Sequence, residues 1–129
     1  MKLLIDTDVL LDVALAREPH VRASAGVMKW VEAGGKAAVA SHSIANCAYL
    51  LKNARPFLRC LLQLVDVAAV GKVEARRALD LPMTDLEDAL QVAAAESWGA
   101  DLVVTRNLRD YRRSPVKAIS PDEFLKKFH

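Results

Sequence analysis

Three groups of polar residues in this sequence carry side chains of the kinds that hold a divalent metal ion. The groups are Asp6 with Asp8, Asp85 with Asp88, and Thr105 with Asn107 and Asp110. Their carboxylate, amide and hydroxyl oxygens are hard ligands, which suit Mg²⁺ or Mn²⁺. Carboxylates that cluster without a cation repel one another and raise each other's pKa values, and a shared metal ion would remove that conflict.

The first and third groups are predicted to follow strands of one sheet. Asp6 and Asp8 come after the apolar run Lys2–Ile5, and Thr105 comes after the apolar run Leu102–Val104. A simpler role for Asp6 or Thr7 is to cap the helix that follows. In parallel sheets, functional sites lie beyond the carboxyl ends of the strands, and both groups are expected at that edge.

The second group is predicted to lie at the start of a helix over 84–99. Thr84 and Glu87 form a T-x-x-E capping box there. Asp85 and Asp88 are three residues apart, so their carboxylates project from one face and could meet a common ion. A simpler role is to complement the helix dipole, which explains Asp85 better than Asp88 because Asp88 falls inside the amphipathic pattern.

The rest of the chain alternates predicted strands with predicted helices. Further strands are expected at 37–40, 65–67 and around 116–118. Further helices are expected at 8–16, 19–32, 44–51, 57–64 and 72–79, and a last one behind a second capping box at Ser120 and Glu123. Because helices return the chain between parallel strands, we expect a three-layer α/β/α fold. Its central parallel sheet would have four or five strands, in a single domain over 1–129.

Composition and charge narrow the class of protein. Hydrophobic residues make up 53% of the chain and charged residues 26%, as in globular domains. No apolar run reaches the roughly 18 residues of a membrane-spanning helix. Asp6 interrupts the first apolar stretch before a signal-peptide core could form, so we expect a cytoplasmic protein. Cys47 and Cys60 lack the spacing of metal ligands and are expected to be reduced thiols.

The net charge is only +2, but the positive charges are concentrated. Residues 105–113 contain four arginines, namely Arg106, Arg109, Arg112 and Arg113. A run of this kind is compatible with a solvated loop. Its place after a predicted strand, beside the third group of metal-binding residues, leaves a functional role open as well.

Three motifs in this order resemble those of PIN-domain nucleases, a family that includes the VapC-type toxins. Residues 5–12 (IDTDVLLD) resemble the opening motif, residues 86–90 (LEDAL) the central motif, and residues 105–111 (TRNLRDY) the segment after the fourth strand. The resemblance covers almost the whole chain. It implies that Asp6 and Asp88 are the first two metal-site acids.

The resemblance also implies a function and a site. The function is hydrolysis of an RNA phosphodiester with Mg²⁺ or Mn²⁺ held by Asp6, Asp88 and Asp110, and with Asp85 and Asp8 as further candidate metal ligands. Thr105 and Asn107 would orient water or phosphate, and the four arginines would bind the RNA backbone. The implied partners are RNA, a small antitoxin protein and a second copy of the chain.

Two positions depart from the family pattern. Asn46 stands where many members carry a glutamate, and Asn107 stands where they commonly carry an aspartate. An amide contributes an oxygen ligand but no negative charge, so weaker metal binding is expected. These departures leave open a degenerate domain that binds RNA or a protein partner without cleavage.

Phosphoryl chemistry would also explain some of these residues. Residues 6–9 (DTDV) resemble the nucleophile motif of haloacid-dehalogenase-like phosphatases, although the later acidic pair of that family is missing. A receiver-like phosphoacceptor would use Asp66, Thr105 and Lys117 at strand ends. It would leave the acids of the second group and the arginines unexplained.

Overall fold

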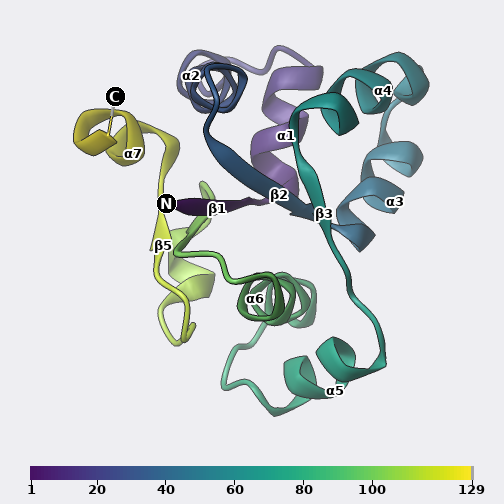
Figure 1. Cartoon of the computed structure of the whole chain (residues 1–129), viewed down its shortest axis with the longest axis vertical. Helices are drawn as coiled ribbons and strands as arrows, with labels where there is room; N and C mark the ends of the chain where they lie inside the picture. The colour runs from purple at the N-terminus through teal and green to yellow at the C-terminus, as the bar shows by residue number, and fades with distance from the viewer. Residues whose placement is uncertain (129) are drawn as a thin grey trace.

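A parallel sheet lies at the centre of the computed structural model, which describes residues 1–128. Within that range the sheet has five strands in the order β3-β2-β1-β4-β5, and every neighbouring pair is parallel. The strands are β1 (Lys2–Ile5), β2 (Lys36–Ala40), β3 (Asp66–Ala68), β4 (Leu102–Val104) and β5 (Ala118–Ile119). The predicted three-layer α/β/α fold with a parallel sheet is confirmed (Figure 1).

Helices cover both faces of the sheet (Figure 1). They are α1 (Thr7–Ala14), α2 (Val21–Glu32), α3 (Ser41–Leu50), α4 (Ala54–Leu64), α5 (Lys72–Asp80), α6 (Leu86–Trp98) and α7 (Pro121–Phe128), with a short 3₁₀ helix, η1 (Leu108–Tyr111). Side chains alternate along a strand, so β1 sends Leu3 and Ile5 into one core and Leu4 into the other. The first core is shared with α1, α2 and α7, and the second with α6.

The central strands bring together residues that are far apart in the sequence. β1 lies between β2 and β4, and Ile5 at its end is paired with Val104. All five strands run in the same direction, so the residues after β1, β2 and β4 meet at one edge of the sheet. α6 packs against β1, β2 and β4 on the face of the sheet opposite α1 and α2 (Figure 1).

The predicted boundary of α6 was right at its end and wrong at its beginning. Gly99 adopts a left-handed conformation with φ 88°, which ends the helix as the sequence predicts. Thr84 does not cap the helix. Asp85 is the N-cap, and its Oδ1 accepts a hydrogen bond from the backbone N–H of Asp88 at 2.9 Å. The predicted T-x-x-E box therefore fails because the adjacent aspartate is an equally good cap.

The other elements agree with the prediction to within a few residues. The second capping position is correct, since Ser120 Oγ accepts from the N–H of Glu123 at 3.1 Å. α4 begins at Ala54, before Pro56, because a proline in the first turn removes no intrahelical hydrogen bond. None of the helices over residues 1–128 is long and apolar enough to cross a membrane.

Candidate metal centre

Asp6 is a buried carboxylate held by three hydrogen-bond donors. Its backbone N–H donates to Val104 O at 2.9 Å, which fixes it at the junction of β1 and β4. Thr105 Oγ1 donates to Asp6 Oδ2 at 2.6 Å, and the hydroxyl of Tyr111 lies 3.2 Å from the same oxygen. Gln91 Nε2 donates to Oδ1. Asp6 is the N-cap residue of α1, as the simpler interpretation predicts, but its side chain makes no capping hydrogen bond and faces these donors instead.

Asp88 is a second buried carboxylate, and it faces Asp6 across one hydroxyl group. The Tyr111 hydroxyl lies 3.2 Å from Asp88 Oδ1 as well as from Asp6. Asp88 Oδ2 is buried and has no hydrogen-bond partner within residues 1–128. Burial, and then the charges of Asp6 and Asp85, raise the pKa of Asp88 to about 7. The folded protein therefore holds this carboxylate in an environment that disfavours its charged form.

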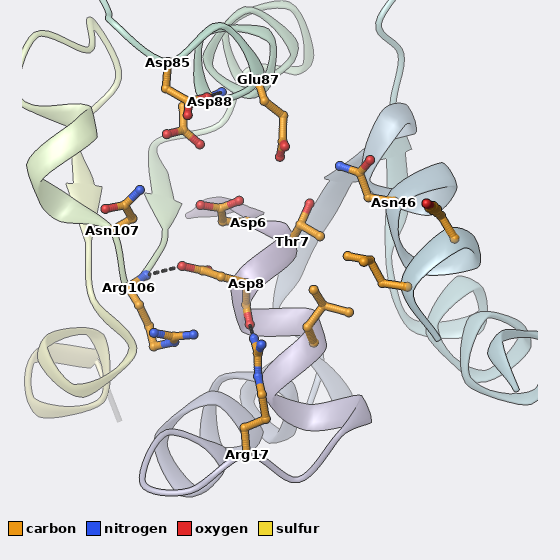
Figure 2. A pocket seen from close by; sticks show the side chains of 13 residues that line it. Asp6, Thr7, Asp8, Arg17, Asn46, Asp85, Glu87, Asp88, Arg106 and Asn107 are labelled. Atoms are coloured by element: carbon orange, nitrogen blue, oxygen red, sulfur yellow. Dashed lines mark hydrogen bonds between the residues drawn. The ribbon is translucent and has the colours of Figure 1, made fainter. Parts of the chain in front are cut away.

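Asp8 is a third carboxyl group at the same edge. Its Oδ2 accepts a hydrogen bond from the backbone N–H of Arg106 at 3.2 Å, and its Oδ1 is buried without a partner in the described part of the chain (Figure 2). Burial is the main reason that the pKa of Asp8 is raised to about 7. The charge of Asp6 adds to the shift, and Arg106 opposes it.

Five acidic side chains form two overlapping groups in which three carboxylate oxygens lie within 4.8 Å of one another. One group is Asp6, Glu87 and Asp88, and the other is Asp85, Asp88 and Asp110. Asp88 belongs to both. The predicted set of Asp6, Asp88 and Asp110 does not come together as one group, because Asp110 approaches Asp88 together with Asp85 and not with Asp6. Glu87 occupies the third position beside Asp6.

The chemistry of the donors fits a divalent metal ion. Asp88 Oδ2 and Asp8 Oδ1 are buried oxygens with no donor within residues 1–128, and a group of that kind is costly to bury unless a cation or a donor approaches it. Glu87 adds a carboxylate whose pKa is also raised by burial and by Asp6. Hard oxygens from separate segments suit Mg²⁺ or Mn²⁺.

A cleft of about 480 Å³ opens onto this cluster (Figure 2). Asp6, Thr7 and Asp8 form its floor, and Asp85, Glu87 and Asp88 lie along the start of α6. Asn46 comes from α3 on one side, and Arg106 and Asn107 come from the segment after β4 on the other. The structure therefore brings to one cleft most of the residues that the sequence singled out.

Thr105 and Asp110 take positions that differ from the prediction. Thr105 is fully buried and does not line the cleft. Its hydroxyl donates to Asp6 and accepts from the N–H of Asn107 at 3.0 Å, so it holds Asp6 instead of facing water or phosphate. Asp110 accepts a hydrogen bond from Asn107 Nδ2 and lines a smaller cavity of about 150 Å³.

The four arginines predicted to bind RNA separate into two kinds. Arg106 turns inward, and its guanidinium forms a bidentate ion pair with Asp12 at 2.7 and 3.1 Å. The other three, Arg109, Arg112 and Arg113, are exposed and line the smaller cavity with Asp110. The RNA contacts of these arginines stay a prediction, and the buried partner of Arg106 was not foreseen.

Sequence reasoning missed several residues of the cluster. Gln91 follows Asp88 by three positions and Glu87 by four, so the helical spacing could have placed it on the same face. Tyr111 was seen only as part of a motif. His42, at the start of α3, is not among the predicted site residues, and both of its ring nitrogens are buried without a partner within residues 1–128. Burial lowers the pKa of His42, and the nearby charge of Asp6 opposes this.

The receiver-like interpretation does not fit this geometry. Asp66 is the first residue of β3, so it lies at the opposite end of that strand from the cluster, and it is exposed. β3 is also separated from β1 by β2.

We compared the chain with models of protein families, with proteins of curated function and with solved structures. Residues 2–109 match the model of a family described as PIN domain. No protein among those with curated functions matches the chain. The match to the family model includes Asp6, Asp8, Asp85 and Asp88, and it ends one residue before Asp110.

Several solved structures have a similar fold. VapBC2 from Rickettsia felis, bound to a DNA fragment from its promoter, has a TM-score of 0.72 at 15% identity, covering 93% of this chain and 98% of that one. A toxin-antitoxin complex from Klebsiella pneumoniae has a TM-score of 0.67 at 20% identity, covering 92% and 97%. VapC20 of Mycobacterium tuberculosis, described as a sarcin-ricin-loop-cleaving toxin, has a TM-score of 0.63 at 15% identity, covering 78% and 86%.

Proposed function

Because the chain belongs to the PIN-domain family, we propose that its acidic cleft hydrolyses RNA phosphodiesters with the help of Mg²⁺ or Mn²⁺. The observation that carries the proposal is the pair of features at Asp88. Its buried Oδ2 has no donor within residues 1–128, and its carboxylate lies within 4.8 Å of carboxylate oxygens of Asp6 and Glu87. A cleft built this way is unfavourable when metal-free and becomes favourable when it holds a hard cation.

Asp6, Glu87 and Asp88 are the proposed ligands, and Asp8 adds negative charge from the floor of the cleft. A divalent ion held there supplies Lewis acidity, which activates water and offsets charge on the phosphate in the transition state. The three donors on Asp6 fix the orientation of its carboxylate before any ligand arrives. Such outer hydrogen bonds typically contribute about ten- to a hundredfold to metal affinity.

Asp110, with Asp85 and Asp88, offers a second group of oxygens, and Asp110 also lines the smaller cavity. We propose that this group binds a second ion or the hydration shell of the first. Arg109, Arg112 and Arg113 surround the smaller cavity and are exposed, so RNA phosphates could approach them from solvent. These three arginines are therefore the proposed contacts for the RNA backbone on this side.

The biological setting we propose is that of a cytoplasmic toxin inhibited by a small antitoxin protein, with the chain forming a homodimer. The support is the fold shared with toxins solved in toxin-antitoxin complexes. The cleft is open and is lined by both acidic and basic side chains, so a partner with a charged segment could cover it.

A second candidate function is RNA or protein binding without cleavage. It is favoured by Asn46, which lines the cleft on the side of α3 and contributes an amide where a further carboxylate would raise metal affinity. The two candidates differ in their dependence on metal. Cleavage needs the ion, whereas a binding module retains its RNA or partner when the ion is removed.

The test is cleavage of a mixed structured RNA by the purified protein with Mn²⁺ or Mg²⁺, beside an EDTA control. Asp88→Asn removes the shared ligand, and Asp80→Asn, on the exposed end of α5, is the matched control. We expect cleavage by the wild type and by Asp80→Asn. The cleavage rate of Asp88→Asn should fall at least about a hundredfold, because loss of an outer partner of a metal ligand alone costs about ten- to a hundredfold. Equal cleavage by Asp88→Asn would contradict the assignment of the metal site. Absence of cleavage by every protein would favour the binding module.

A further inference from the structure

Asp12 is a completely buried carboxylate that holds two arginines beside the cleft. Arg106 contacts it through Nε at 2.7 Å and Nη2 at 3.1 Å. Arg17 contacts it through Nε at 3.0 Å and Nη2 at 3.0 Å. Ser24 Oγ, from α2, donates to Asp12 Oδ2 at 3.0 Å. The carboxylate is therefore saturated with donors, and each arginine is held in one orientation.

The backbone after α1 is shaped to deliver Arg17 to this position. Ala16 has φ 49°, in the left-handed region that alanine rarely adopts. The turn that it makes lets the N–H of Arg17 donate to Asp12 O at 3.0 Å. The guanidinium then runs back along α1, where Nη2 also donates to Asp8 O at 3.2 Å. Ala16 directly precedes Arg17, which lines the cleft, and unusual backbone conformations of this kind cluster at functional sites.

The two guanidinium groups lie side by side and carry more charge than Asp12 can neutralise. Both donate to Asp12 Oδ1, so they share one oxygen. Asp12 is the only carboxylate with which either guanidinium forms an ion pair within residues 1–128, and the charge of Arg106 also acts on the neighbouring carboxyl of Asp8. Within residues 1–128, no hydrogen bond uses Nη1 of either arginine. The side chains of Arg17 and Arg106 are 38% and 29% exposed, and both line the acidic cleft (Figure 2).

We propose that Arg17 and Arg106 form a binding subsite for a phosphodiester group of the RNA backbone, next to the group that lies at the acidic cluster. The inference rests on the proposed function for the identity of the polymer. Arginine forks match the oxygens of a phosphate, and donors whose side chains are already fixed lose little entropy on binding. Asp12 supplies that fixation because it is buried and cannot itself approach the ligand.

The position of the subsite suits a strand that crosses the metal centre. Arg17 and Arg106 flank Asp8, on the opposite side of the cleft from Glu87 and Asp88 (Figure 2). A phosphate at the arginines would place its neighbour over the acids. The subsite thus positions the chain, in contrast to the three exposed arginines of the smaller cavity, which are held by no ion pair within residues 1–128.

The test measures RNA binding without cleavage. The probe is a fluorescein-labelled 2′-O-methyl RNA dodecamer without terminal phosphates, followed by anisotropy in EDTA at several salt concentrations. The variants are Arg17→Ala, Arg17→Lys and the matched control Arg76→Ala, which removes the same charge from the exposed surface of α5. Thermal melting of each protein shows whether it is folded.

We expect Arg17→Ala to weaken binding about tenfold, the effect of losing a charged hydrogen bond, and to reduce the salt slope by about 0.7. Arg17→Lys keeps the charge but loses the fork, so its affinity should be intermediate, and Arg76→Ala should bind like the wild type. Binding by Arg17→Ala equal to that of Arg76→Ala would overturn the subsite. If Arg17→Ala does not fold, wild-type affinity in Arg17→Lys would overturn it instead.

Two further arms separate the sources of phosphate and the two proposals. Inorganic phosphate at millimolar concentration should displace the dodecamer from the wild type only weakly. If Arg17→Ala loses the binding of inorganic phosphate but keeps the binding of RNA, the subsite is overturned. The binding arm runs without metal, so an Arg17-dependent affinity in a protein that cleaves no RNA would uphold the subsite and reject the nuclease. If the wild type cleaves RNA but Arg17→Ala binds it as tightly as the wild type does, the nuclease is upheld and the subsite is rejected.

Discussion

Thr105 donates its hydroxyl hydrogen to Asp6 at 2.6 Å, although the two residues are 99 positions apart in the chain. The contact is buried, and it joins the end of β1 to the end of β4. A charged acceptor makes this hydrogen bond stronger than one between neutral groups. Its removal should therefore affect both the stability of the protein and the position of the carboxylate.

Thr105→Val is the change that tests this contact, because it keeps the shape of the side chain and removes the donor. We expect the free energy of unfolding to fall by about 1–3 kcal/mol, and Mn²⁺ affinity to fall about tenfold because Asp6 is less firmly oriented. Denaturant unfolding and calorimetric titration measure the two effects. Thr84→Val, at an exposed position before α6, should change neither quantity. Unchanged metal affinity in Thr105→Val would contradict an orienting role.

The stability of the metal-free protein should depend on pH in an unusual direction. The pKa values of Asp8 and Asp88 are each raised from 3.8 to about 7 in the folded state. The folded state therefore binds these protons more tightly than the unfolded chain does. As pH rises through the window from 3.8 to about 7, the free energy of unfolding decreases, and it stays low above that window.

We expect metal-free protein to melt at a lower temperature at pH 8 than at pH 5, measured calorimetrically at constant ionic strength. Mn²⁺ should raise the melting temperature more at pH 8, where the ligands are already deprotonated. Asp88→Asn should flatten the pH profile, whereas Asp80→Asn should leave it unchanged. A metal-free protein that is more stable at pH 8 would show that these carboxyls are not raised in pKa.

Tyr111 places one hydroxyl between two carboxylates, and it has one proton to donate. Its own pKa is raised by burial and by the charges of Asp6 and Asp88, so it remains a donor throughout the stable pH range. Tyr111→Phe removes the donor, and we expect the pKa of Asp88 to rise further because the hydrogen bond from Tyr111 lowers it. A carboxyl ¹³C NMR titration measures this shift. Tyr49→Phe alters a hydroxyl on a side chain that is 80% exposed, and it should leave the titration of Asp88 unchanged.

Asn46→Glu adds a carboxylate to the wall of the cleft formed by α3. We expect about tenfold tighter Mn²⁺ binding, since a charged oxygen ligand replaces a neutral amide. The metal-free protein should become less stable because the acids repel one another. Isothermal titration with Mn²⁺ is the measurement, and Gln63→Glu adds the same charge on the exposed surface of α4 as a control. If the two variants bind Mn²⁺ equally, Asn46 is not close enough to coordinate.

The sheet and its functional edge could be predicted from the sequence because those features depend on local patterns. Short apolar runs followed by polar residues are visible in β1 and β4, and the alternation of elements makes the sheet parallel. The ligand set was predicted less well. Whether Glu87 or Asp110 stands beside Asp6 depends on the rotation of α6 and the path of η1, which are decided by tertiary packing.

The polar network around Asp12 could not be predicted from local patterns at all. Asp12 lies in the opening motif, where its burial was not foreseen, and its partners come from a turn, from α2 and from the segment after β4. Nothing in the spacing of Arg17 and Arg106 identifies them as neighbours, since they are joined only through a carboxylate between them. Contacts of this kind become visible only when the strand order is known.

The order of the strands also affects how the protein is made. β1 leaves the ribosome well before its neighbour β4, and the donors Thr105 and Tyr111 follow α6 in the chain. A nascent chain that ends at Trp98 already contains the carboxyls of Asp6 and Asp88 and lacks Thr105 and Tyr111, two of the residues that hold them. Such long-range pairing forms late because the closure of a long loop must precede it. The acidic centre is therefore assembled only after most of these residues have been synthesised.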